Sequence, residues 1–164
     1  MKSKVNKSLV VDKESRDVKF PLTFIVKGVI PSQNHLYGHS KFGVYMRPEG
    51  KLYKINVARV VCEKLGFESV VDEKKKLITV LQSVKTLPTD KFELDYKIYG
   101  RWLTKSGETL TSDCNNRLKI LDDSIADALS IDDKFFWKTT VEKIHEELEE
   151  NYRVEINLTP YIKT

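Results

Sequence analysis

Apolar residues at helical spacing mark two segments of the chain. From Pro48 to Leu65 they recur every three or four positions, with a proline at the start and Gly66 as a stop signal. A second segment, from about Asn116 to Leu129, carries one apolar stripe and several acidic residues on another face. The stripe consists of Leu118, Leu121, Ile125 and Ala128. Both segments are predicted to be helices that pack on a common core.

Other segments alternate apolar and polar residues or are rich in β-branched and aromatic ones, which is typical of strands. They are Phe20–Gly28, Val44–Met46, Leu77–Val84, Phe92–Leu103, Phe136–Ile144 and Tyr152–Leu158. We expect Leu77–Val84 and Phe92–Leu103 to be neighbours, and the last two to form an antiparallel pair. Turn-forming residues make 31–43 a long loop. The pattern predicts a mixed α/β (α+β) domain with a mixed sheet of about five strands and two main helices.

The chain of 164 residues fits one domain, since a domain averages roughly 150 residues. Residues 1–18 have no sustained period and predict a flexible basic arm, whereas residues 19–164 form the domain. The longest apolar run, Phe20–Val26, is too short to span a membrane, and no leader pattern precedes it. Cys62 and Cys114 lack the spacing of a zinc or redox site. We expect an intracellular protein with reduced cysteines and no membrane partner.

Charge is distributed unevenly between the two halves of the chain. Residues 1–82 hold 16 Lys and Arg against 8 Asp and Glu, whereas residues 83–164 hold 12 against 16. A basic half suits a polyanion such as DNA, and clustered carboxylates suit a divalent metal. The alternative is two solvated faces of opposite sign.

The densest group of reactive side chains precedes and follows the second predicted helix. Asp113 and Asn115 come before it, Lys119 lies one turn into it, and Asp132 and Asp133 follow its end. A strand that folds back after the helix would bring these oxygen ligands together, as a hard cation such as Mg²⁺ requires. The ammonium of Lys119 would then be available to a phosphate oxygen.

Purely structural roles are open alternatives for the same residues. Asp113 or Asn116 could cap the helix, and Asp132 with Asp133 could form a turn. His35 and His39 could supply two nitrogen ligands to a metal, although Gly38 between them disfavours a regular helix. No motif of a serine or cysteine nucleophile is present.

These residues resemble the RusA-type Holliday junction resolvases of bacteria and their phages. The signature of that family is similar to a series of residues at the start of the second predicted helix and after its end. These residues are Asp113, Asn115-Asn116, Arg117 and Lys119, and then Asp132-Asp133. Two earlier segments, 30–37 and 45–54, are similar to its Pro-Ser turn and to the strand and helix start after it. The resemblance covers roughly residues 20–158.

The resemblance implies a Mg²⁺-dependent endonuclease, with Mn²⁺ as a substitute, that acts as a homodimer and nicks a four-way DNA junction during recombination and repair. It implies metal ligands at Asp113 and Asp133, an accessory acid at Asp132 and a catalytic lysine at Lys119. No organic cofactor is implied, and the location would be the cytoplasm of a bacterial host cell. DNA-backbone contacts are expected from Arg117, Asn34, Lys51, Lys54 and Arg59.

One position departs from the pattern of the family. Asn115 stands where the family usually has a second aspartate, so the site has one negative charge fewer. An amide oxygen is still a ligand for Mg²⁺. The alternative function is therefore a protein of the same fold that binds branched DNA without cleaving it.

Overall fold

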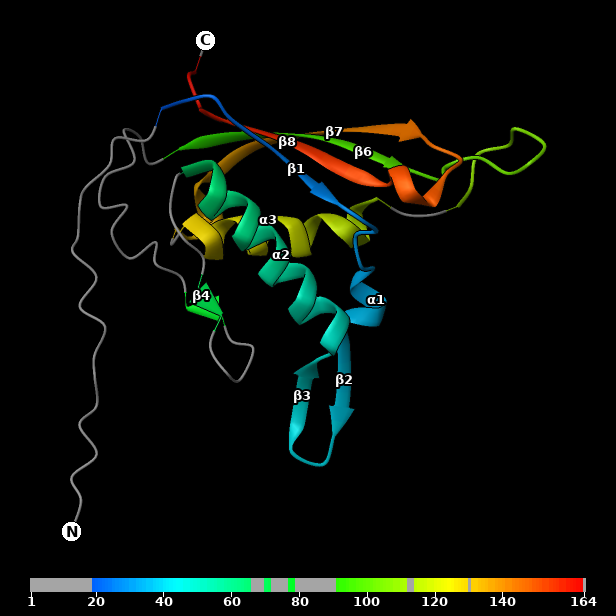
Figure 1. Ribbon diagram of the computed structural model, residues 1–164, viewed down its shortest axis with the longest axis horizontal. Helices are drawn as coiled ribbons and strands as arrows, with labels where there is room; N and C mark the ends of the chain where they lie inside the picture. Colours follow the sequence, from blue (N-terminus) through cyan, green and yellow to red (C-terminus); the bar gives the residue numbers. More distant parts are fainter. Residues whose placement is uncertain are drawn as a thin grey trace.

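A mixed sheet of four strands, in the order β1-β8-β6-β7, organises the protein (Figure 1). The computed structural model describes residues 19–65, 70–71, 77–78, 91–111, 114–129 and 131–163. The strands of this sheet are β1 (Leu22–Lys27), β6 (Phe92–Gly100), β7 (Phe136–His145) and β8 (Arg153–Pro160). The predicted arm, residues 1–18, lies outside the described residues.

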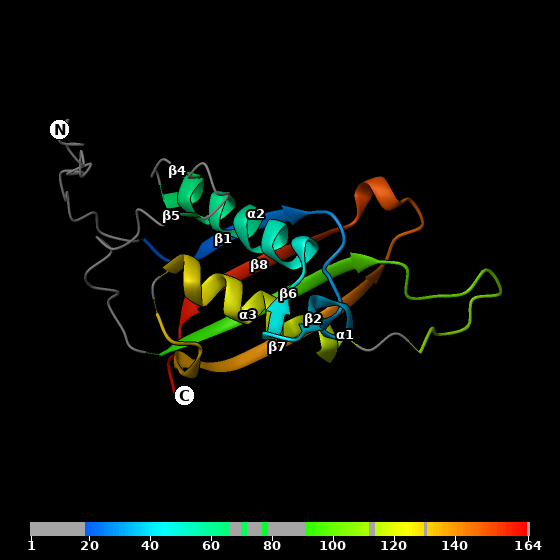
Figure 2. The same cartoon turned by 90° about the horizontal axis from the view of Figure 1, so that it is seen from below.

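Two long helices cover one face of the sheet. They are α2 (Pro48–Leu65) and α3 (Asn115–Leu129), which lie side by side beneath the strands (Figure 2). Alternate residues of β1, β6 and β8 are buried against them, while the opposite face of the sheet is open. The buried core includes Val26, Val57, Leu94, Leu121, Ile125, Val154 and Leu158. The prediction of a mixed α/β domain with two main helices is confirmed.

The remaining elements are short. Between β1 and α2 lie α1 (Gln33–Leu36) and a hairpin of β2 (Tyr37–Ser40) and β3 (Gly43–Met46). The prediction of a loop over 31–43 is therefore wrong. Strands β4 (Val70–Val71) and β5 (Leu77–Ile78) form a sheet of their own, so Leu77–Ile78 pairs with β4 instead of β6. The rest of the strand predicted over Leu77–Val84, residues 79–84, lies outside the described residues. Two 3₁₀ turns, η2 (Asp133–Phe135) and η3 (Glu149–Asn151), flank β7.

The final two strands are not neighbours, contrary to the prediction. Strand β6 lies between them and pairs in parallel with β7 and antiparallel with β8. Burial follows this order, because the inner strands β6 and β8 alternate buried and half-buried residues whereas most residues of β7, at one edge, are exposed. A strand with few apolar residues to bury is best accommodated at the edge of a sheet.

The two cysteines lie in the core. Cys62 and Cys114 are both buried and form no disulfide. Among the described residues, no helix has the length and the apolar character needed to cross a membrane.

Candidate functional site

Helix α3 presents a polar face beside its buried stripe, and this face carries the candidate chemistry. Ile120, Leu121 and Ser124 are buried on the other side of the helix. The hydroxyl of Ser124 donates to the carbonyl of Ile120, so its polar atom is satisfied within the helix. Packing of this apolar side fixes the helix on the sheet and sets the direction of its polar face.

Lys119 lies on the polar face, next to two carboxylates. Its Nζ is 3.4 Å from Oδ1 of Asp123, one turn further along α3, and its side chain is 54% exposed. The charge of Asp123, followed by their hydrogen bond, raises the pKa of Lys119, and the charge of Asp133 adds to this shift. Lys119 and Asp133, which come from α3 and η2, therefore lie within electrostatic reach of each other. That these two residues share a metal-dependent site stays a prediction.

A third carboxylate, Asp122, joins this group from the inner side of the helix. The hydroxyl of Tyr96, buried on β6, donates to Asp122 Oδ1 at 2.6 Å. Burial raises the pKa of Asp122 most, and the charges of Asp123 and Asp133 raise it further, against the opposing effects of Tyr96 and Lys119. Negative charge thus accumulates along one side of α3.

Asp132 has a structural role in this group. Its side chain accepts a hydrogen bond from the backbone N–H of Lys134 and caps η2, and its Oδ2 lies 3.2 Å from Lys134 Nζ. The backbone hydrogen bond from Lys134 is the main cause of a lowered pKa for Asp132. The turn that the sequence offered as an alternative is present, and a contribution of Asp132 to metal binding stays a prediction.

The predicted metal ligands are only partly described. Asp113 and the preceding Ser112 lie outside the described residues, whereas Asn115 begins α3 with an exposed side chain. Within the described ranges, no three His, Cys, Asp or Glu side chains converge as a metal site. The donors present are carboxylate and amide oxygens, which match a hard divalent cation in chemistry.

Two of the predicted DNA contacts are engaged within the protein. Lys54 on α2 forms an ion pair with Asp127 on α3, with Nζ and Oδ2 2.5 Å apart. Arg117 donates from Nη1 to the carbonyl oxygen of Ile30 at 3.1 Å, and its guanidinium lies 5.8 Å from the ring centroid of Trp102. Both side chains hold elements together, and their direct contact with DNA stays a prediction.

The other predicted DNA contacts are exposed. Asn34 is in α1, and Lys51 and Arg59 are in α2. A narrow crevice between α1, the hairpin and the two helices adjoins Lys119. Its lining includes Tyr37, Met46, Lys54, Lys119 and Asp123. The candidate site thus lies where the hairpin meets α3.

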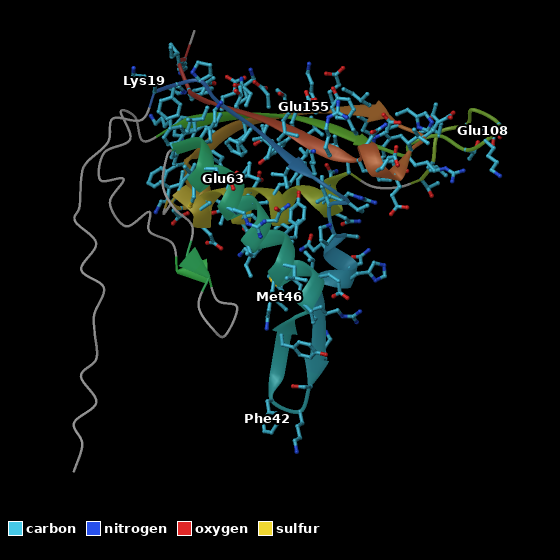
Figure 3. The ribbon with its side chains drawn as sticks, in the orientation of Figure 1. Lys19, Phe42, Met46, Glu63, Glu108 and Glu155 are labelled. Carbon is cyan, nitrogen blue, oxygen red and sulfur yellow. The ribbon has the colours of Figure 1, made fainter. Side chains whose placement is uncertain are left out.

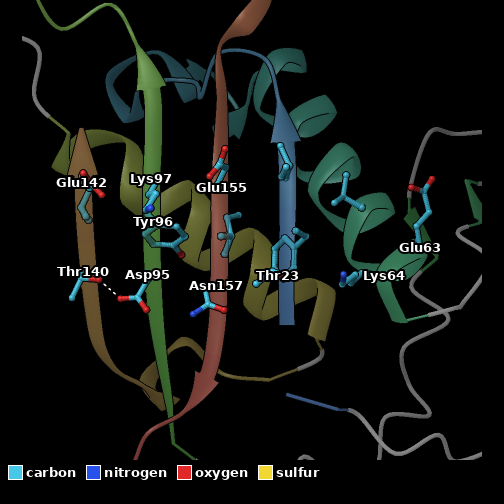
Figure 4. Close-up of a pocket in the computed structure, with 15 residues that line it drawn as sticks. Thr23, Glu63, Lys64, Asp95, Tyr96, Lys97, Thr140, Glu142, Glu155 and Asn157 are labelled. Carbon is cyan, nitrogen blue, oxygen red and sulfur yellow. Dashed lines mark hydrogen bonds between the residues drawn. The ribbon is translucent and has the colours of Figure 1, made fainter. Parts of the chain in front are cut away.

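A large hollow lies elsewhere, on the open face of the sheet (Figure 4). It has a volume of about 1040 Å³ and is lined mainly by strand residues, among them Thr23, Asp95, Thr140 and Asn157. Thr140 donates to Asp95, and Oδ1 of Asn157 is buried without a hydrogen-bond partner. The hollow contains none of the predicted site residues.

Sequence reasoning missed Asp122 and Asp123 as members of the site. Asp123 could have been found, because it follows Lys119 by four residues, the spacing at which helical side chains meet. Asp122 could not, since its neighbour Tyr96 is on a distant strand. Neither a protein-family model nor a curated protein sequence matches the chain.

Proposed function

We propose that the protein is a structure-selective endonuclease that resolves four-way DNA junctions by metal-dependent phosphodiester hydrolysis. The observation that carries this proposal is the ion pair of Lys119 with Asp123 on the polar face of α3, next to Asp122. The charge of Asp133 raises the pKa of both Lys119 and Asp122. A protein that only binds DNA gains nothing from such carboxylates, because they repel phosphate unless a cation intervenes.

The residues divide the chemistry between them. Asp113, Asn115 and Asp133 would hold Mg²⁺ or Mn²⁺, with Asp132 as accessory acid. When bound, such an ion polarises a phosphate oxygen. In hydrolysis, water adds to phosphorus, the bond to one sugar oxygen breaks, and that oxygen takes up a proton. Lys119 would stabilise the negative charge that develops in this step.

Exposed cations would hold the DNA. Lys51 and Arg59 are available to phosphates, with Asn34 as a neutral hydrogen-bonding group. Arg117 and Lys54 contribute indirectly, by fixing α3 against the loop after β1 and against α2. Two nicks at equivalent positions require two equivalent sites, and a two-fold homodimer is the simplest assembly that supplies them.

The second candidate is a branched-DNA-binding protein that does not cleave. Asn115 favours it, because an amide in place of a carboxylate lowers the negative charge available to a cation. In this case the carboxylates on α3 would stabilise the fold through Lys119 and Tyr96 alone.

Incubation with a synthetic mobile four-way junction separates the two candidates. We expect Mg²⁺ or Mn²⁺ to produce paired nicks in the junction and none in a linear duplex of the same sequence. Junction binding without cleavage at any concentration of either metal would reject the enzyme and leave the non-cleaving binder.

A further inference from the structure

The hairpin of β2 and β3 projects from the body of the protein and ends in an aromatic residue. Phe42 lies at the tip, far from the sheet, whereas Met46 lies near the base (Figure 3). The exposed fraction of Phe42 is 89%, and Val44 and Tyr45 on β3 are also exposed. Isolated exposed apolar residues are common on protein surfaces, but a group of them on one projecting arm is typical of a contact surface.

The tip of the arm is held by local hydrogen bonds. The backbone N–H of Phe42 donates to Ser40 Oγ at 3.2 Å, and the Ser40 hydroxyl donates to the carbonyl of Gly43 at 3.3 Å. Gly43 has a φ of 119°, which a side chain would strain. Lys41 Nζ lies 5.0 Å from the centroid of the Phe42 ring. The aromatic ring and a cation are therefore presented together.

The base of the arm is fixed to the body. The backbone N–H of Arg47 donates to the carbonyl of Leu36 at 2.7 Å. A Cβ atom at Gly50, in the first turn of α2, would lie 2.8 Å from Leu36 and 3.1 Å from Met46, so the helix packs closely here. The arm therefore has a defined direction relative to α2 and to the crevice beside Lys119.

The charge of the arm indicates its partner. No Asp or Glu occurs from Gly28 to Pro48, and the charged residues there are Lys41 and Arg47. The arm carries positive charge and an aromatic tip, and it has no acidic residue. It therefore fits a partner that has negative charge together with flat apolar faces. Nucleic acid has both, because bases stack on aromatic side chains and phosphates pair with lysine and arginine.

We propose that the β2–β3 hairpin is a DNA-probing arm that places Phe42 against unpaired or unstacked bases at the branch point. Apolar side chains enter a duplex only by unstacking its base steps, and this costs least where stacking is already interrupted. The arm thus selects branched over linear DNA. This inference rests on the proposed function, since it assigns substrate selection at the same site.

The test measures binding without divalent metal, so that cleavage plays no part. A four-way junction carries 2-aminopurine at its branch point, a base whose emission rises when its neighbours unstack. We expect the protein to raise this emission, and Phe42→Ala to abolish the rise and weaken junction binding about 10-fold, the effect of losing one stacked aromatic. Binding to linear duplex should change less than about 2-fold.

Two further variants serve as controls. Phe42→Trp should retain the emission change, because indole also stacks. Ile162→Ala removes another exposed apolar residue, 78% exposed, away from the hairpin, and should bind the junction as the parent does. Circular dichroism of each variant establishes that the fold is intact.

Several outcomes would overturn the proposal. These are unchanged junction binding by Phe42→Ala, an equal loss on junction and duplex, or no junction binding by the parent. Binding to anionic lipid vesicles that depends on Phe42, without a junction effect, would make the arm a membrane contact instead. If Phe42→Ala cleaves junctions as fast as the parent, the proposed role of the arm is rejected and the proposed endonuclease activity is retained. If junction binding depends on Phe42 but the parent does not cleave in Mg²⁺, the role of the arm is retained and the endonuclease activity is rejected.

Discussion

The ammonium group of Lys119 pairs with a carboxylate in the structure, and the proposed mechanism requires the same group to contact a phosphate. In the structure it pairs with Asp123 across one helical turn, at a surface-exposed position. Exposed pairs of this kind contribute little to stability, because water and salt screen them. The ammonium can therefore exchange Asp123 for a phosphate oxygen at small cost in folding free energy.

Lys119→Ala tests whether Lys119 contributes to cleavage and contributes little to the stability of the fold. We expect junction cleavage to fall by about 10²-fold or more, the usual effect of removing a group that stabilises transition-state charge. The free energy of unfolding should change by no more than about 0.5 kcal/mol, as for other surface substitutions. Single-turnover cleavage and urea unfolding supply the two values.

A matched control exists on the open face of the sheet. Lys138 is also exposed and forms an ion pair with a carboxylate, that of Glu93. Lys138→Ala should leave cleavage unchanged. Equal activity of the Lys119 variant and this control would remove Lys119 from the mechanism.

Asp122 should give the stability of the protein a distinct pH dependence. Burial raises its pKa above the value in the unfolded chain. Between the two pKa values the folded state binds more protons, so its stability falls as pH rises. Asp122→Asn cannot titrate but can still accept the hydrogen bond from Tyr96. We expect urea unfolding to show this variant gaining stability relative to the parent as pH rises above the usual aspartate pKa of about 3.9.

Asp132 should give the stability a pH dependence of the opposite sign to that of Asp122. Its pKa is lowered by the hydrogen bond from Lys134, so its contribution is present at neutral pH and is lost as pH falls. Asp132→Asn should therefore lose stability relative to the parent as pH rises toward the usual aspartate pKa of about 3.9, and the difference should stay constant above that pH. Parallel trends in the two variants would contradict the assignment of these environments.

At the scale of elements, Arg117 connects α3 to the loop after β1. Its hydrogen bond to Ile30 and its packing on Trp102 are both lost in Arg117→Ala. We expect a loss of roughly 1–2 kcal/mol in the free energy of unfolding, from one hydrogen bond and the packing of the aliphatic stem. Arg59→Ala, at an exposed position of α2, should change it by less than about 0.5 kcal/mol.

DNA binding should distinguish the same two arginines. Arg59→Ala should weaken junction binding and reduce its salt dependence, because a phosphate contact is lost. Arg117→Ala should bind the junction more weakly only because less of the protein is folded. Its binding should therefore recover at lower temperature, where more of the variant is folded. Direct phosphate contact by Arg117 would instead give a reduced salt dependence with unchanged stability.

Local patterns in the sequence predicted the elements better than their pairing. The bounds of α2 agree with the prediction, and α3 begins one residue earlier, because helical spacing and stop signals are local properties. The insertion of β6 between β7 and β8 depends on which strands bury most surface, a non-local property. In the hairpin at 37–46 the second strand was predicted at Val44–Met46, whereas the first, Tyr37–Ser40, was missed because it is short and contains a glycine.

In the candidate site, too, local relations were easier to predict from the sequence than non-local ones. The pair of Lys119 with Asp123 is the part that a local pattern can give, because residues four apart on a helix lie next to each other. The engagement of Arg117 with Ile30 and Trp102 could not be predicted, since those residues come from segments far away in the sequence.

At the scale of the whole molecule, the proposal requires two copies of the chain. Symmetric nicks on a four-way junction need two equivalent sites related by a two-fold axis. We expect sedimentation equilibrium at micromolar concentration to give the mass of a dimer, free or on the junction. A monomer in both conditions would count heavily against the resolvase.

The central claim is that the carboxylates serve metal-dependent cleavage, and Asp133→Asn tests it most directly. One labelled junction reports both readouts, binding without metal and paired nicking with Mg²⁺ or Mn²⁺. We predict paired nicks by the parent, and no cleavage by the variant with equal or tighter binding, because repulsion between carboxylate and phosphate decreases. An equal loss of binding and cleavage in the variant, or a parent that binds the junction and never cleaves it, would contradict the account.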